Sequence, residues 1–158
     1  MNQHVWVGEK PLHLECGEVL QDWRVTYSTY GTLNADKSNV VWVFHALTGS
    51  SRVTDWWPGL VGEGKLFDPM KDFIICANML GSCYGSTLPN RALVPMLTIR
   101  DMVEAHRQLH AHLGLGKIRV GIGGSMGGQQ LLEWAVREPD VFDVIVPMAT
   151  NAVHSAWG

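Results

Sequence analysis

The chain has 158 residues, of which 46% are hydrophobic and 17% are charged, and this composition is typical of one globular domain spanning residues 1–158. The formal net charge is -3 and the lysines and arginines are scattered, so a nucleic-acid partner is not expected. No segment approaches the roughly 18 apolar residues of a membrane span, and residues 1–20 lack the apolar run of a signal peptide. We therefore expect a cytoplasmic protein without a membrane partner.

The cysteines and acidic residues argue against a metal site. Cys16, Cys76 and Cys83 are odd in number and widely spaced, which favours neither a disulfide framework nor a zinc site. The acidic residues show no grouping typical of metal ligands. We expect no metal.

Strands are predicted first along the chain. Residues 23–30 (WRVTYSTY) are rich in β-branched and aromatic side chains, and a polar turn follows at residues 31–37. Residues 39–45 (NVVWVFH) form a short apolar run of the kind found in strands buried on both faces of a parallel sheet. Three further runs of this kind are residues 73–79, 118–122 and 141–148.

Two helices separate the later strands. Thr98 and Asp101 resemble a capping box, and apolar residues recur at helical spacing from there to Leu113, where glycines follow. The second helix is predicted over residues 126–137 and ends before Pro139. Buried strands that alternate with amphipathic helices indicate an α/β fold with a mostly parallel central sheet flanked by helices.

A nucleophile elbow is predicted between the strand at residues 118–122 and the second helix. Residues 123–127 (GGSMG) fit the pattern G-x-S-x-G, in which a serine sits on a sharp strand-to-helix turn. Gly123 and Gly127 fit because side chains at these positions would collide with the turn or with neighbouring strands. Ser125 is the predicted nucleophile.

The glycine-rich turn also fits two other hypotheses, in which it binds a phosphate or binds no ligand. A dinucleotide fingerprint beginning at Gly121 fails because Met126 occupies its last glycine position. A phosphate-binding loop fails because Gly116 and Lys117 are followed by Ile118.

An acyl-transfer serine also needs donors for the oxyanion. In this fold one donor is the backbone amide after the nucleophile, here Met126, and the other comes from the loop after an earlier central strand. That loop is residues 45–49 (HALTG), and we expect the amide of Leu47 to face the site. Taken alone, the loop also fits an ordinary connection between strand and helix.

A second loop is expected to line the pocket. Gly81, Gly85 and Ser86 follow the strand at residues 73–79, and parallel sheets bind ligands at this end of their strands. Cys83 lies in the same loop but has neither an elbow nor a neighbouring base, so a loop or pocket-lining role is expected.

Several longer motifs resemble one enzyme family over nearly the whole chain and in the same order. This family is homoserine O-acetyltransferase of methionine biosynthesis, an acyltransferase of the α/β-hydrolase superfamily, and the resemblance is to its N-terminal part. The motifs are HALTGS (45–50), DWWPGLVGEGKLFDP (55–69), ANMLGSCYGST (77–87), GGSMGGQQ (123–130), LEW (132–134) and ATNAVHSAWG (149–158).

The resemblance implies an α/β-hydrolase fold and a ping-pong acyl transfer. Ser125 would take the acetyl group from acetyl-CoA and pass it to L-homoserine, with the amides of Leu47 and Met126 holding the oxyanion. The acyl donor is a substrate, and no cofactor is implied. Family members usually dimerise through a helical lid. Serine O-acetyltransferases and succinyl-transferring enzymes share much of the pattern.

The chain departs from the family in two places. It stops near where the lid begins, before the last strands of the sheet, so the acid and histidine of the triad are expected beyond residue 158. Neither His45 nor His154 is expected to replace that histidine as general base. Residues 86–98 form a shorter loop than the family has, so no role is assigned to Arg91.

Three rivals therefore stay open: a serine esterase or hydrolase, a serine O-acetyltransferase on the same fold, or a non-catalytic fragment. The strand at residues 141–148 is expected to form an exposed apolar sheet edge, which favours self-association or aggregation.

Overall fold

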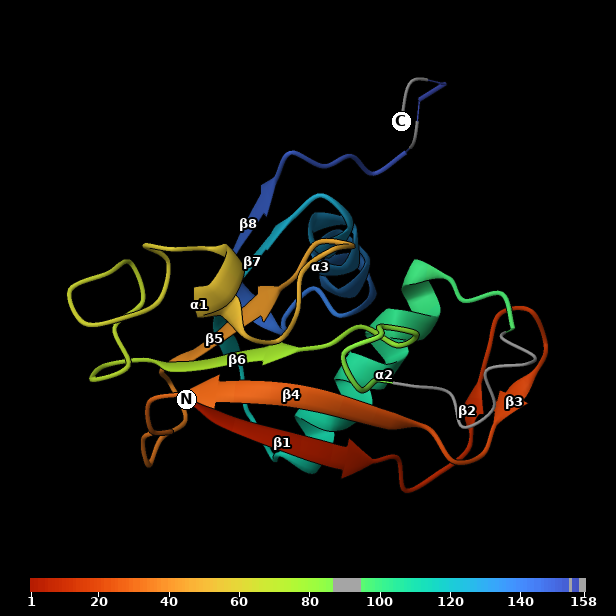
Figure 1. Cartoon of the computed structure of the whole chain (residues 1–158), viewed down its shortest axis with the longest axis horizontal. Coiled ribbons are helices and arrows are strands. Elements are labelled where there is room, and N and C mark those ends of the chain that lie inside the picture. Colours follow the sequence, from red (N-terminus) through yellow and green to blue (C-terminus); the bar gives the residue numbers. More distant parts are fainter. Residues whose placement is uncertain (87–94, 154, 157–158) are drawn as a thin grey trace.

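The computed structural model describes residues 1–86, 95–153 and 155–156, and its centre is a six-stranded sheet (Figure 1). The strands lie in the order β1-β4-β6-β5-β7-β8. Their bounds are Asn2–Val7 for β1, Arg24–Tyr30 for β4, Val40–Phe44 for β5, Phe73–Ala77 for β6, Ile118–Gly124 for β7 and Phe142–Met148 for β8.

The sheet is parallel over its four strands β6, β5, β7 and β8, and β7 leads into the elbow. β5 pairs in parallel with both β6 and β7, and β7 pairs in parallel with β8. β4 and β1 are antiparallel to their neighbours. The register pairs Phe44 with Gly123, so the carboxyl ends of β5 and β7 lie side by side. The loops that follow these two strands therefore start next to each other.

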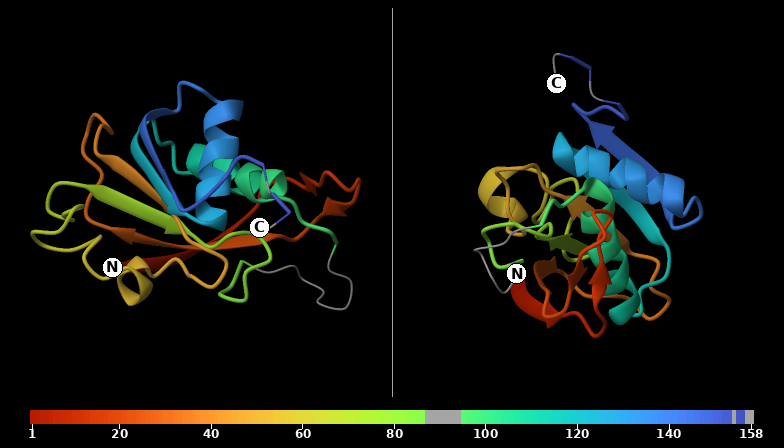
Figure 2. Two further views of the ribbon diagram at one scale, coloured as in Figure 1. Left: turned by 90° about the horizontal axis from the view of Figure 1, so that it is seen from above. Right: turned by 90° about the vertical axis from the view of Figure 1, so that its right-hand side faces the viewer.

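Helices cover both faces of the sheet (Figure 2). α2 (Ile99–His112) and α3 (Met126–Arg137) lie over one face, and the short α1 (Val53–Trp56) lies over the other. Side chains of β5 alternate accordingly: Trp42 joins the cluster under α2 and α3, whereas Val41 joins the cluster under α1. Burial on both faces explains why the central strands are continuous apolar runs.

The predicted α/β fold is confirmed, and so are the five predicted strands and two predicted helices. The strand predicted over residues 39–45 ends at Phe44, and the one predicted over residues 118–122 continues to Gly124. α2 begins after a complete capping box between Thr98 and Asp101, as predicted. The expected apolar edge is also present, because β8 is the last strand of the sheet and most of its side chains are exposed.

Three strands near the N-terminus were not predicted. β1 shows only Trp6 buried among its six residues, so the apolar pattern of a buried strand is missing. β2 (Leu12–His13) and β3 (Val19–Leu20) form a hairpin of two residues each, too short to be recognised by periodicity. In the part of the chain described, no helix is both long and apolar enough to span a bilayer.

Candidate active site

Ser125 lies on a sharp turn between β7 and α3. Its φ of 54° and ψ of -126° are values that side-chain-bearing residues rarely adopt, and such strain costs on the order of 1–3 kcal/mol. The turn is held by the Ser125 amide, which donates to the Met148 carbonyl at 3.0 Å, and by the Thr150 hydroxyl, which donates to the Ser125 carbonyl at 2.9 Å. The Ser125 side chain is exposed and makes no capping hydrogen bond to α3, so its hydroxyl is free to face a ligand.

Gly123 and Gly127 allow this turn to pack against β5. A Cβ on Gly127 would lie 2.2 Å from the Phe44 carbonyl oxygen, and a Cβ on Gly123 would lie 2.6 Å from the Gly127 carbonyl oxygen. Both distances are far below van der Waals contact, and both involve backbone atoms that cannot move aside. Close backbone contacts in the fold therefore require glycine at both positions.

Leu47 belongs to a tight turn directly after β5. The Gly49 amide donates to the Ala46 carbonyl at 2.9 Å, which places Leu47 and Thr48 at the two central positions. Among the hydrogen bonds of the described residues, none uses the Leu47 amide as donor. The Met126 amide is the first of α3, where helical N–H groups have no partner within the helix.

A hollow of about 440 Å³ opens where these loops meet. Leu47 and Met126 both line it, and so does Gly81, which follows β6. The structure thus brings together the two predicted oxyanion residues and one predicted pocket residue at the carboxyl ends of three parallel strands. A second hollow of about 530 Å³ continues between α2 and α3 and shares Leu97, Met102 and Met126 with the first.

The other two predicted pocket residues do not line either hollow. The Ser86 side chain is fully buried, where its hydroxyl donates to the Asn78 carbonyl at 2.8 Å and accepts from the Thr26 amide at 3.0 Å. Gly85 has φ of 101°, and a Cβ there would lie 2.5 Å from the Thr26 hydroxyl. These contacts anchor the loop after β6 to β4. Cys83 is exposed and lines the first hollow.

His45 lies beneath the Leu47 turn and is 1% exposed. Its Nδ1 lies 2.8 Å from the Ala46 carbonyl oxygen, and its Nε2 accepts from the Met79 amide at 3.1 Å. Burial lowers the pKa of His45, although the Ala46 carbonyl favours the charged form. Since both ring nitrogens are occupied, the ring has no free nitrogen with which to deprotonate Ser125.

A second buried histidine lies on α2. His106 packs between the rings of Trp42 and Phe44, with ring centroids 5.9 Å away in both cases. Burial lowers its pKa to about 3, and the neighbouring His45 contributes in the same direction. A neutral histidine enclosed by aromatic rings fits the packing role expected for this helix.

No histidine of residues 1–86 and 95–153 is hydrogen-bonded to the Ser125 hydroxyl. His154, which was not expected to act as the base, lies outside the described residues, and so do Arg91 and most of the short loop at residues 86–98. The bond of His45 to the Met79 amide was not predicted from the sequence, and neither was the role of Asn78, whose side chain accepts from the Ser51 amide at 2.6 Å. These two bonds join residues 34 and 27 positions apart in the chain, so only the fold reveals them.

Comparisons with known proteins identify the family and the fold of the chain. The family described as alpha/beta hydrolase fold matches residues 39–158. Homoserine O-acetyltransferase of Chlorobaculum tepidum is 47% identical over 158 aligned residues, which cover 94% of this chain and 44% of that protein. The chain thus spans less than half the length of the curated relatives it matches.

Solved structures resemble the whole chain. Homoserine O-acetyltransferase from Bacillus anthracis is 25% identical with a TM-score of 0.85, covering 98% of this chain and 48% of that one. An acetylester hydrolase from Corynebacterium glutamicum is 31% identical with a TM-score of 0.87, covering 99% of this chain and 46% of that one. The chain therefore belongs to the α/β-hydrolase family, and over nearly its whole length it is similar to homoserine O-acetyltransferases.

Proposed function

We propose that Ser125 is the nucleophile of an acyl transfer, and that the protein transfers an acetyl group from acetyl-CoA to L-homoserine. The observation that carries the proposal is the strained turn at Ser125, with φ of 54° and with Gly127 packed against the Phe44 carbonyl. The fold holds this residue in a costly conformation, which is a recurring feature of catalytic sites. The 47% identity to a homoserine O-acetyltransferase supports the choice of substrates.

The reaction proceeds in two steps. The Ser125 oxygen attacks the thioester carbon of acetyl-CoA, the carbon–sulfur bond breaks, and the CoA thiol leaves with a proton. The γ-hydroxyl of homoserine then attacks the acetyl-serine ester, which releases O-acetyl-L-homoserine and restores the serine hydroxyl. In each step the carbonyl oxygen gains negative charge. The amides of Leu47 and Met126 are proposed to stabilise that charge, and α3 adds the positive end of its dipole.

A general base is still needed to activate the serine. In α/β-hydrolases the acid and the histidine follow the nucleophile along the chain. We place both in the portion of the relatives that this chain does not span. The proposal therefore assigns the nucleophile and the oxyanion donors to these 158 residues, and proton transfer to the remainder of the whole protein.

Mass spectrometry of the chain tests the nucleophile. After incubation with acetyl-CoA, or with the more reactive p-nitrophenyl acetate, we expect one acetyl group on the peptide that contains Ser125. Adding the C-terminal half of the Chlorobaculum tepidum relative should accelerate the labelling if that half supplies the base. Ser125→Ala should abolish the label, whereas Ser38→Ala, in an exposed loop far from the elbow, should keep it. A label that survives Ser125→Ala would overturn the proposal.

Ester hydrolysis is the second candidate, because an acetylester hydrolase is structurally similar at 31% identity and a TM-score of 0.87. The two candidates differ in the acceptor of the acetyl group. Acetylated protein is mixed with homoserine and the products are quantified. Formation of O-acetylhomoserine supports the transferase, whereas release of acetate at a rate that ignores homoserine supports the esterase.

A further inference from the structure

We propose that His45 is a positioning residue that sets the direction of the Leu47 amide. The proposal rests on the proposed function, in which that amide binds the oxyanion. His45 is 1% exposed and lies at the first position after β5. Its ring contacts the backbone on both sides, at the Ala46 carbonyl and at the Met79 amide.

The two contacts fix the tautomer of the ring. A backbone N–H can only donate, so the Met79 amide at 3.1 Å requires an unprotonated Nε2 as acceptor. In the neutral ring the proton then resides on Nδ1, where it donates to the Ala46 carbonyl at 2.8 Å. Burial keeps the ring neutral by lowering its pKa. Each ring nitrogen thus has a partner that matches it.

The bond to Ala46 determines where the Leu47 amide points. The Ala46 carbonyl and the Leu47 N–H belong to the same peptide unit, which is planar and trans, so they point in opposite directions. The carbonyl is held by the His45 ring from one side and by the Gly49 amide at 2.9 Å. Anchoring the carbonyl in this way turns the Leu47 N–H away from the protein interior. It donates to no group among the described residues and is left available for a ligand.

The other ring nitrogen ties the loop after β5 to the loop after β6. Met79 and Gly81 line the same hollow as Leu47. The hydrogen bond from the Met79 amide to the His45 ring therefore holds the backbone from Met79 to Gly81 at a fixed distance from the turn that carries the Leu47 amide. Gly49 allows the turn to pack this closely against His45, because a Cβ at position 49 would lie 3.0 Å from the His45 Cβ.

Two substitutions separate the two contacts. The side-chain amide of asparagine carries an N–H donor near the place of Nδ1, and that of glutamine carries an oxygen acceptor near the place of Nε2. His45→Asn therefore keeps the bond to Ala46 and loses the one to Met79, whereas His45→Gln does the reverse. The direction of the Leu47 N–H is measured in each by residual dipolar coupling. The ¹⁵N shifts of the His45 ring in the unaltered chain report its tautomer.

We expect the Leu47 coupling of His45→Asn to match the unaltered chain and that of His45→Gln to differ. We also expect the rate of Ser125 acetylation to fall by about ten- to a hundredfold in His45→Gln and by less than about threefold in His45→Asn. A purely structural role would instead lower both rates in proportion to stability.

Two results would overturn the proposal: an Nε2-protonated ring in the unaltered chain, or a Leu47 coupling that is the same in both variants. Neither measurement needs catalysis, and the ring tautomer is determined on the unaltered chain, so it tests the proposal even if a variant does not fold. Failure of Ser125 to become acetylated, even when the C-terminal half of the relative is added to supply the base, would refute the proposed function and would leave the coupling result to decide the role of His45.

Discussion

At the elbow, replacing the hydrogen of a glycine by the methyl group of alanine would disturb the packing of α3 against the sheet. Gly127 lies against the backbone of β5, with the Phe44 and His45 carbonyl oxygens 2.2 Å and 2.9 Å from the place a Cβ would take. Carbonyl oxygens of a central strand cannot rotate away as a flexible side chain can. A larger residue at this position must push α3 away from the sheet.

We therefore predict that Gly127→Ala lowers the free energy of unfolding by on the order of 1–3 kcal/mol, the usual cost of overpacking. Urea unfolding followed by circular dichroism measures it. Gly116→Ala is the matched control, because nothing lies within 4 Å of its would-be Cβ, and it should change stability little. Equal losses in the two variants would show that close packing at the elbow does not set the cost.

At this scale the sequence predicted the position of Ser125 and the need for Gly123 and Gly127, because the elbow is a local pattern. It did not predict the contacts of His45. Its partner Met79 lies 34 residues away, and only the folded sheet brings the two together. Ser86 was predicted to line the pocket, yet it is fully buried against β4, a contact that also depends on the tertiary fold.

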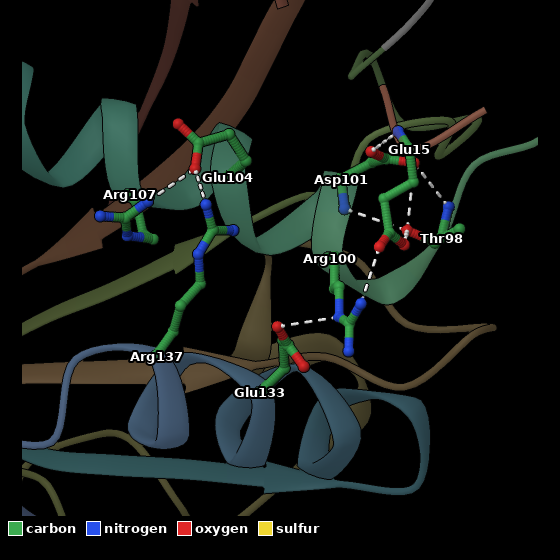
Figure 3. A network of polar contacts seen from close by, with 8 residues as sticks. All are labelled: Glu15, Thr98, Arg100, Asp101, Glu104, Arg107, Glu133 and Arg137. Carbon is green, nitrogen blue, oxygen red and sulfur yellow. Dashed lines mark hydrogen bonds and ion pairs between the residues drawn. The ribbon is translucent and has the colours of Figure 1, made fainter. Parts of the chain in front are cut away.

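Among the elements, α2 carries a capping residue with two functions (Figure 3). Asp101 accepts from the Thr98 amide at 2.9 Å, which completes the capping box. Its other oxygen accepts from the amide of Glu15 at 2.9 Å, in the loop between β2 and β3. Glu15 in turn forms an ion pair with Arg100, so the N-terminal hairpin is tied to the first turn of α2.

Substituting Asp101 should therefore cost more than the loss of a helix cap alone. We predict that Asp101→Ala lowers the free energy of unfolding by about 1–3 kcal/mol, because two amides lose their acceptor at a side chain that is 2% exposed. Hydrogen exchange should also show faster exchange at Glu15. The control is Asp143→Ala, whose exposed ion pair with Lys117 at 3.5 Å contributes about 0–1 kcal/mol. An unchanged exchange rate at Glu15 would refute the link to the hairpin.

The capping box was predicted from Thr98 and Asp101 because they are three residues apart. The second bond of Asp101 was not, since Glu15 is 86 residues away. β1 was not predicted from the sequence, and the reason is related. An edge strand with one buried side chain in six has no continuous apolar run, and its place in the sheet is set by pairing with β4.

For the molecule as a whole, the sheet ends in two different edges. β1 closes one side and β8 the other. The β8 edge carries large exposed apolar side chains on both faces. They are Val144, Ile145, Val146 and Met148, with exposures between 36% and 52%. The unpaired N–H and C=O groups of such an edge can form a ladder with another chain.

We predict that these 158 residues associate through β8 at micromolar concentration, and sedimentation velocity should show species larger than the monomer. Val144→Lys places a charge on the edge, where pairing with a second copy would bury it or bring two like charges together, so it should shift the distribution toward the monomer. Val5→Lys makes the same change on β1, where Val5 is 61% exposed, and should leave the association unchanged. A monodisperse monomer before any substitution, or an equal response to both, would show that the β8 edge does not drive association.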